Sequence, residues 1–226
     1  MFSNKKALLL DMNSTFMFGE DSFGISEDFS RYYHQAGGAL SKNEINIIIR
    51  SVYAYLDERY PDEKYRHNFP SIESAIYNAV THDLNVDEIS KIVDTFAFHE
   101  IGYIPDEYIA ALYKLSKKFQ LAVVIDIWAP KSSWLNLFEE SGINKLFTAS
   151  SFSSDHGIVK PSPKPFELVV EQLGIKKEQA LVVGDSIRRD LGGAKAAGID
   201  CVLVGGSKHY HAVGCYDNLL ELSHAV

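Results

Sequence analysis

The stretch KALLLDMNST, residues 6–15, places a short apolar run directly before a carboxylate and a group of small polar residues. An apolar run of this length, bounded by polar turn formers, is typical of a buried strand in a parallel sheet. Such a strand delivers Asp11 to its carboxyl end, where open parallel sheets concentrate their chemistry. Asp11 is therefore a candidate nucleophile or metal ligand, and the plainer structural interpretation is an aspartate that caps the next turn.

The sequence from residue 105 onward alternates helical patterns with short apolar runs. We expect helices at about 105–119, 132–140, 163–173 and 190–197, and strands at 121–125, 146–149, 180–183 and 201–204. Repetition of this βαβ kind predicts an α/β fold, a doubly wound parallel (Rossmann-like) sheet with helices on both faces. The strand at residues 7–10 can be buried centrally only if it joins this later sheet.

The region between the first strand and this sheet carries helical patterns without strands. Helices are expected at about 27–35, 41–59, 71–83 and 86–98. The second begins with Ser41 and Glu44, which have the spacing of a capping box. We therefore predict a four-helix cap domain, residues 18–103, inserted into a core domain made of residues 1–17 and 104–226.

The composition is that of an ordinary globular protein, with 46% hydrophobic and 23% charged residues. A net charge of −8 argues against a nucleic-acid partner and against an anionic membrane surface. No apolar run approaches the length of a membrane span and the N-terminus has no signal-peptide pattern, so we expect a cytoplasmic protein. Two cysteines, Cys201 and Cys215, are too few for a disulfide framework.

Polar residues gather at four points near one edge of the expected sheet. They are Asp11 with Asn13, then Asp126, then Lys160, then Asp185 with Ser186 and Asp190. In order and spacing these positions resemble the haloacid dehalogenase-like (HAD) hydrolase superfamily, most of whose members are magnesium-dependent phosphatases. The passages VVGDSIRRDLGGAKAAG, residues 182–198, and KPSPKPF, residues 160–166, carry the resemblance most specifically. The resemblance covers the whole chain, and the helical insert matches the all-helical kind of cap.

The resemblance implies a nucleophile and a magnesium site at this edge. Asp11 would attack phosphorus and form an aspartyl phosphate that water later hydrolyses. The carboxylates of Asp11 and Asp185 and the backbone carbonyl of Asn13 would bind Mg²⁺, which prefers oxygen ligands. The substrate implied is a small phosphorylated metabolite.

Further residues are expected around these ligands. Lys160 would hold the phosphoryl group and balance the charge of the carboxylates. Ser186 and Asp190 would lie next to the metal ligands, where Asp190 could orient a metal-bound water, pair with Lys160 or cap the following helix. The side chains expected to line the substrate pocket are Phe16, Phe18 and Trp128.

Two positions depart from the superfamily's pattern. Its first motif usually has a second aspartate, acting as general acid and base, where this chain has Asn13. Asparagine transfers no proton, and losing a general acid/base costs about two to four orders of magnitude in rate. The second motif, which binds the phosphoryl group, aligns on Ile125 and Asp126, although isoleucine donates no hydrogen bond and a carboxylate repels phosphate. If the alignment shifts by one residue, Asp126 takes the motif position itself.

The sequence leaves three functions open. The favoured one is a Mg²⁺-dependent phosphatase that the absence of an acid/base at Asn13 slows. The first alternative is a catalytically impaired HAD-fold protein that binds a phosphorylated ligand or a protein partner. The second is a metal-independent 2-haloacid dehalogenase, which Asp185 and Asp190 disfavour. The substrate's identity and the oligomeric state are undetermined.

Overall fold

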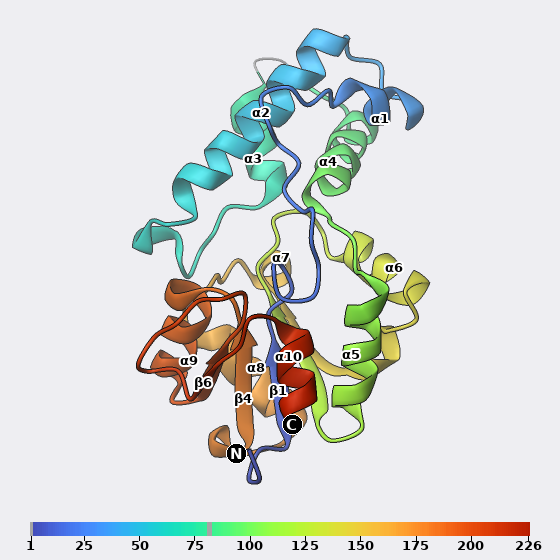
Figure 1. Cartoon of the computed structure of the whole chain (residues 1–226). Helices are drawn as coiled ribbons and strands as arrows, with labels where there is room; N and C mark the ends of the chain where they lie inside the picture. The colour runs from blue at the N-terminus through green and yellow to red at the C-terminus, as the bar shows by residue number, and fades with distance from the viewer. Residues whose placement is uncertain (1, 81–82) are drawn as a thin grey trace.

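One parallel sheet forms the centre of the molecule. The computed structural model describes residues 2–80 and 83–226. Within them the strands are β1 (Ala7–Leu10), β2 (Gln120–Ile125), β3 (Phe147–Phe152), β4 (Ala180–Gly184), β5 (Asp200–Leu203) and β6 (Gly214–Cys215). Their order is β3-β2-β1-β4-β5-β6, and all adjacent pairs are parallel. The expected doubly wound α/β sheet is confirmed, with β1 between β2 and β4 (Figure 1).

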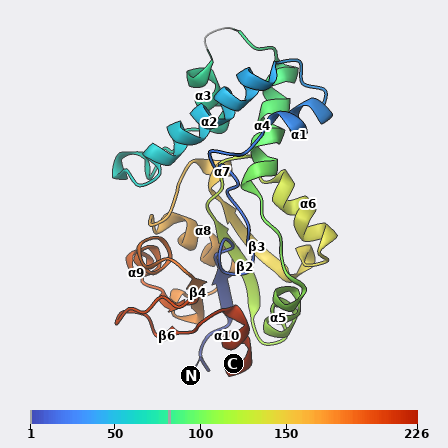
Figure 2. The same ribbon diagram turned by 45° about the horizontal axis from the view of Figure 1, so that its top comes forward.

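Helices cover both faces of this sheet (Figure 1, Figure 2). One face is covered by α5 (Asp106–Ser116), α6 (Ser132–Glu140) and α10 (Leu219–Ala225). The other face is covered by α8 (Lys164–Leu173) and α9 (Gly192–Ala197). The short helix α7 (Ser153–His156) directly follows β3. Side chains of a strand alternate between its two faces, and β1 does so. Leu8 and Leu10 join the apolar cluster of α5, α6 and α10, whereas Ala7 and Leu9 join that of α8 and α9. The run of four apolar residues is thus explained by burial on both faces.

The register of β1 brings its carboxyl end level with that of β4. Leu10 pairs with Val123 of β2 and with Val183 of β4. The N–H of Asp11 then donates to the carbonyl of Val183 at 2.8 Å. The residues that follow β1 and β4 therefore emerge side by side at one edge of the sheet.

Four α-helices stand beyond that edge (Figure 1, Figure 2). They are α1 (Ser30–Gln35), α2 (Lys42–Arg59), α3 (Ile72–Ala79) and α4 (Val86–Glu100), with a short 3₁₀ turn at Glu63–Tyr65. The capping box of α2 is formed, because the N–H of Glu44 donates to Ser41 Oγ (3.3 Å) and the N–H of Ser41 donates to the Glu44 carboxylate (2.9 Å). The helical character expected of the insert is confirmed.

The chain enters and leaves this helical region through two neighbouring segments. The N–H of Phe18 donates to the carbonyl of Tyr103 (2.9 Å), and the N–H of Tyr103 donates to the carbonyl of Phe18 (2.8 Å). We refer to residues 18–103 as the inserted helical segment. The segments that enter and leave the helical region therefore run side by side between the sheet and these helices.

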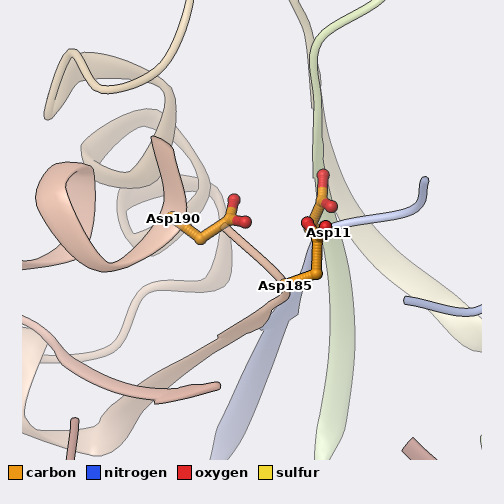
Figure 3. A group of neighbouring side chains, drawn as sticks. All are labelled: Asp11, Asp185 and Asp190. Carbon is orange, nitrogen blue, oxygen red and sulfur yellow. The ribbon is translucent and has the colours of Figure 1, made fainter. Parts of the chain in front are cut away.

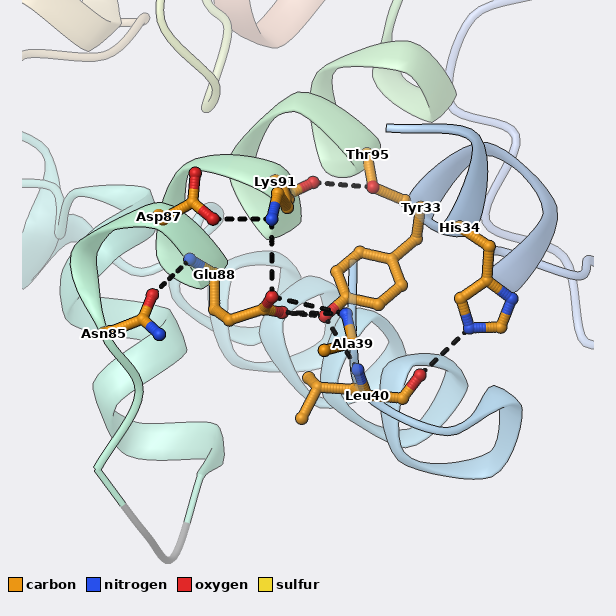
Figure 4. Close-up of polar contacts among 9 residues, drawn as sticks. All are labelled: Tyr33, His34, Ala39, Leu40, Asn85, Asp87, Glu88, Lys91 and Thr95. Atoms are coloured by element: carbon orange, nitrogen blue, oxygen red, sulfur yellow. Dashed lines mark hydrogen bonds and ion pairs between the residues drawn. The ribbon is translucent and has the colours of Figure 1, made fainter. Parts of the chain in front are cut away.

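A buried carboxylate joins α1 to α4 within the inserted helical segment (Figure 4). Glu88 accepts hydrogen bonds from the Tyr33 hydroxyl and from the N–H of Ala39 (3.2 Å), and Lys91 lies 3.5 Å away. The Tyr33 hydroxyl in turn accepts from the N–H of Leu40 at 3.1 Å. These contacts pair the backbone N–H groups of the partly exposed loop after α1 and give the buried Glu88 carboxylate its donors.

Besides α7 and the longer β3, the structure departs from the expected elements in three places. The third helix of the insert ends at Ala79, because Val80 is extended. The expected end at residue 83 follows residues 81 and 82, which lie outside the described residues. A π turn, Ile187–Leu191, precedes α9, so that the helix expected at 190–197 changes its winding at Gly192. β6 and α10 have no counterpart among the expected elements, since two residues of strand carry no readable period.

The helices of the described residues are amphipathic or short. None of them combines the length and apolar character that crossing a membrane requires.

Candidate active site

Three carboxylates meet at the carboxyl edge of the sheet (Figure 3). Asp11 follows β1, Asp185 follows β4, and Asp190 belongs to the π turn. One carboxylate oxygen from each residue lies within 4.8 Å of the other two. Asp11 and Asp185 meet because their strands are adjacent and parallel, whereas Asp190 reaches them only through the geometry of the turn.

Lys160 lies between two of these carboxylates. Its ammonium Nζ is 2.5 Å from Asp11 Oδ1 and 2.8 Å from Asp190 Oδ1, and its side chain is only 2% exposed. Burial alone would lower the pKa of Lys160, but the charges of Asp11, Asp190 and Asp126 raise it well above its ordinary value. The lysine is therefore a fixed cation, and of the three alternatives for Asp190 the pairing with Lys160 is present.

The π turn holds Asp190 in place. The N–H of Ser186 donates to Asp190 Oδ2 at 3.0 Å, and Ser186 Oγ accepts from the N–H of Arg189 at 3.2 Å. Gly184 leaves room for this arrangement, because a Cβ added there would lie 2.4 Å from the carboxyl carbon of Asp190. Extra helical width of this π kind is frequent at functional sites, and here it carries a charged site residue.

The surroundings of these carboxylates favour either their protonated form or a cation bound between them. Burial and the neighbouring Asp190 raise the pKa of Asp11 to about 7, even though Lys160 lowers it. Burial and Asp190 also raise the pKa of Asp185. Asp185 Oδ1 is buried without a hydrogen-bond partner. Three carboxylates near Lys160 and Arg189, with an unpartnered oxygen among them, fit a divalent cation that takes oxygen ligands.

Asn13 lies in a tight loop after Asp11. The carbonyl of Met12 accepts from the N–H groups of Thr15, Phe16 and Met17, and Ser14 adopts a positive φ of 56°. Asn13 Oδ1 is buried and has no hydrogen-bond partner. The loop therefore keeps Asn13 next to the nucleophile position, as the sequence predicts, but with a side chain that transfers no proton.

Ile125, the last residue of β2, and Asp126, which follows it, have different surroundings. Ile125 is 2% exposed and its side chain belongs to the apolar cluster of α5 and α6, so it offers nothing to a phosphoryl group. Asp126 is the first polar side chain beyond the strand. Its Oδ2 accepts from the N–H of Lys160 (2.9 Å) and from the hydroxyl of Tyr60 (2.6 Å), and its Oδ1 is buried without a partner. The contact with Lys160 places Asp126 at the site, where burial raises its pKa.

The structure gives the expected pocket residues Phe16 and Phe18 different surroundings. Phe16 is completely buried against Phe138 and Phe147, because the tight loop turns it back into the core. Phe18 packs edge-on against Tyr108 within the connection to the inserted helical segment. The burial of Phe16 contradicts its expected place in the pocket, whereas for Phe18 that place stays a prediction.

Trp128 does border a cavity. A space of about 370 Å³ lies between the inserted helical segment and the sheet, lined by Phe69, Ser71, Trp128, Ser132 and Asp155 among others. Trp128 also contacts the rings of Tyr53, Tyr60, Phe69 and Phe96. It thus lies where the helices meet the loop after β2.

Two residues of the inserted helical segment reach the site loops without having been expected there. Tyr60 follows α2 and hydrogen-bonds Asp126, and Glu100 ends α4 and binds the backbone after Asp126. The sequence shows Tyr60 as one of several tyrosines on a helical pattern, so no local signal distinguishes it. Its role depends on how α2 docks onto the sheet.

Known proteins that are similar to this chain are hydrolases. A family model described as haloacid dehalogenase-like hydrolase matches residues 5–198. A glyceraldehyde 3-phosphate phosphatase of Methanopyrus kandleri is 27% identical over 169 residues, which cover 74% of this chain and 71% of that protein. The pyrophosphatase PpaX of Halalkalibacterium halodurans is 38% identical over 131 residues, 57% of this chain. The chain spans about half the length of PpaX, since the match covers 52% of it.

Solved structures agree in fold. The HAD phosphatase from Thermococcus onnurineus is 23% identical, with a TM-score of 0.64 and 97% of each chain covered. A 2-haloacid dehalogenase from Pseudomonas syringae pv. Tomato DC3000 is 20% identical, with a TM-score of 0.65 and the same coverage. The family match spans most of the sequence and includes the strands that bring Asp11 and Asp185 together. The chain belongs to the haloacid dehalogenase-like hydrolases.

Proposed function

We propose that this hydrolase is a Mg²⁺-dependent phosphatase that acts on a small phosphorylated metabolite through an aspartyl phosphate at Asp11. The observation that carries the proposal is the position of Lys160, whose ammonium group joins Asp11 to Asp190 beside Asp185. A fixed cation next to a carboxylate nucleophile is what transfer of a phosphoryl group requires. The phosphatase names of the relatives support the same class of reaction.

The reaction follows from these groups. A carboxylate oxygen of Asp11 forms a bond to phosphorus while the bond from phosphorus to the leaving oxygen breaks. Lys160 holds the transferred phosphoryl group close to the carboxylate. A water molecule then attacks phosphorus, which releases inorganic phosphate and restores Asp11. When bound by Asp11, Asp185 and the carbonyl of Asn13, Mg²⁺ supplies positive charge that neutralises the phosphoryl oxygens.

Asn13 limits the rate in this scheme. The leaving oxygen needs a proton and the attacking water must lose one, and asparagine can do neither. Solvent must supply and accept these protons instead. We therefore expect slow turnover with intact binding of the metal and of phosphate.

The parts of the chain divide accordingly in our proposal. Residues 1–17 and 104–226 form the core domain with the chemical groups, and residues 18–103 form the cap domain that excludes water and selects the leaving group. A cavity of about 370 Å³ lies at the junction of the two beside Trp128, but Asp11, Lys160 and Asp185 do not line it. We also propose a cytoplasmic location.

A catalytically impaired protein that binds a phosphorylated ligand is the second candidate. Asn13 without a proton to transfer and Ile125 buried in the core favour it. Dehalogenation without metal is supported less, because the cluster of Asp11, Asp185 and Asp190 combines repelling charges that a cation would relieve.

A metal-dependent screen separates these candidates. Wild type, Asn13→Asp and Asp11→Asn are assayed on a panel of phosphate esters with and without MgCl₂, and wild type also on a 2-haloacid. We expect Mg²⁺-dependent release of phosphate that Asp11→Asn abolishes and that Asn13→Asp increases by about two to four orders of magnitude. Hydrolysis only in Asn13→Asp favours the impaired protein. Metal-free turnover of the haloacid contradicts the proposal.

A further inference from the structure

The residue that follows α2, Tyr60, is surrounded by groups of the sheet's loops. Its ring meets Trp128 and Phe69 edge-on, with ring centroids 5.8 Å apart in both cases. The guanidinium carbon of Arg189 lies 5.7 Å from its centroid. The carbonyl of the next residue, Pro61, accepts a hydrogen bond from Arg188 at 3.2 Å. The end of α2 is therefore attached to the loops after both β2 and β4.

The hydroxyl of Tyr60 makes its short contact with Asp126, and the Arg189 guanidinium interacts with it as well. The hydroxyl donates to Asp126 Oδ2 at 2.6 Å, the short distance expected when a hydroxyl meets a carboxylate. Burial and the charge of Asp126 raise the pKa of Tyr60 well above its ordinary value, so the phenol keeps its proton and acts as a donor. Tyr60 thereby fixes the rotamer of Asp126.

The same oxygen of Asp126 also accepts from the backbone N–H of Lys160 at 2.9 Å. The backbone of Lys160 is thus held from one side by Asp126, while its ammonium group is held on the other by Asp11 and Asp190. A displaced Asp126 leaves that N–H buried without an acceptor and lets the lysine's backbone move. Since Lys160 lies 2.5 Å from the nucleophile, a small movement changes the distance that phosphoryl transfer depends on.

We propose that Tyr60 is a positioning residue, which holds Asp126 on the backbone of Lys160 and so makes the placement of the lysine's ammonium group depend on α2 lying against the sheet's loops. This role rests on the proposed function, in which Lys160 holds the phosphoryl group. The phenol itself touches neither the nucleophile nor the lysine's ammonium group. Tyr60 acts through Asp126.

Three variants test the role with a matched control. Tyr60→Phe removes the hydroxyl and keeps the ring, whereas Tyr53→Phe makes the same change on α2 at a ring that also contacts Trp128. In the Mg²⁺-dependent assay, we expect Tyr60→Phe to lower kcat by about tenfold with little change in KM, the loss of one hydrogen bond to a charged group. Tyr53→Phe should keep the wild-type kcat.

The third variant, Asp126→Asn, shows whether the two residues act together. Its amide oxygen can still accept from both donors but carries no negative charge, so each hydrogen bond is weaker and the effect of Tyr60→Phe should be smaller in this background than in wild type. Additive losses in kcat overturn the proposal. So does a Tyr60→Phe chain that is less stable to urea but has wild-type kcat, because that result means a purely structural role.

Binding of inorganic phosphate separates this role from the proposed function. If wild type hydrolyses no ester, the proposed function fails. Calorimetric titration of phosphate in the presence of MgCl₂ then tests whether Tyr60 still positions Lys160. We expect Tyr60→Phe to raise the Kd for phosphate by about tenfold and Tyr53→Phe to leave this Kd unchanged. A wild-type chain that binds no phosphate, or equal Kd values in the two variants, overturns the role.

Discussion

The carboxylate of Glu100, at the end of α4, accepts a hydrogen bond from the backbone N–H of Trp128 at 2.6 Å. Its other oxygen accepts from the N–H of Ala129 at 2.8 Å. Through this residue the inserted helical segment holds the backbone of the loop after β2, just beyond Asp126. Burial raises the pKa of Glu100 to about 8, and the two hydrogen bonds only partly oppose it.

The stability of the protein should therefore depend on the protonation of Glu100. A pKa raised from its ordinary value of 4.5 to about 8 means that the folded state binds the proton more tightly than the unfolded state. This group's contribution to stability is complete below its ordinary pKa and is lost as pH rises through about 8, with a slope of up to about 1.4 kcal/mol per pH unit. Urea unfolding across this range should show a steeper slope in wild type than in Glu100→Gln, where Asp11, with its own raised pKa, still contributes. Parallel profiles would refute the assignment.

Removal of the buried lysine should destabilise the fold, and Mg²⁺ should oppose the loss. Lys160→Met leaves Asp11 and Asp190 buried without their cation, which costs about 3–5 kcal/mol. The exposed pair of Lys164 and Glu167, 3.5 Å apart, provides the control, since Lys164→Met should cost about 0–1 kcal/mol. Urea unfolding with and without MgCl₂ measures both variants. A Lys160→Met protein as stable as Lys164→Met without metal contradicts the expected charge balance.

Gly184 should be intolerant of a methyl group. In Gly184→Ala the new Cβ would lie 2.4 Å from the carboxyl carbon of Asp190 and would displace that side chain from Lys160. The matched control is Gly192→Ala, whose Cβ would meet its nearest atom at 3.6 Å, an ordinary contact. We expect phosphatase activity to fall at least tenfold in the first variant and to persist in the second, as one misplaced site residue suffices. Equal activities would mean that Asp190 has room to move.

The polar network of Figure 4 should stabilise the inserted helical segment without affecting chemistry. Tyr33→Phe removes a donor to the buried Glu88 and the acceptor of the Leu40 N–H, at a cost of about 1–3 kcal/mol in unfolding free energy. Tyr77→Phe, at a ring that is 63% exposed, should be neutral. Kinetic assays of Tyr33→Phe should give wild-type kcat at a temperature where the variant is folded. An altered kcat would mean that the network reaches the site.

The sequence predicts those parts of the fold and site that depend on local pattern. An apolar run ending at Asp11 and the βαβ alternation suffice for the sheet, and neighbouring parallel strands then bring Asp11 and Asp185 together. The positions of Lys160 and Asp190 depend on the paths of loops. Only the resemblance to a family predicts them.

Residues whose position depends on packing between elements were missed or misplaced. Phe16 follows the nucleophile closely, yet three N–H groups donating to the Met12 carbonyl turn it into the core. Tyr60 and Glu100 lie at helix ends whose docking no local pattern encodes. Side chains that join two elements are therefore where tertiary geometry adds most.

The paired backbone of Phe18 and Tyr103 makes the inserted helical segment a loop whose ends already meet. The conformational entropy of closing a loop grows only slowly with its length. The entropy lost on closing this loop therefore depends only weakly on the number of residues between these two positions. The inserted helices can therefore vary in length with little effect on the register of β1, provided that the ends of α2 and α4 keep Tyr60 and Glu100 on the loop after β2.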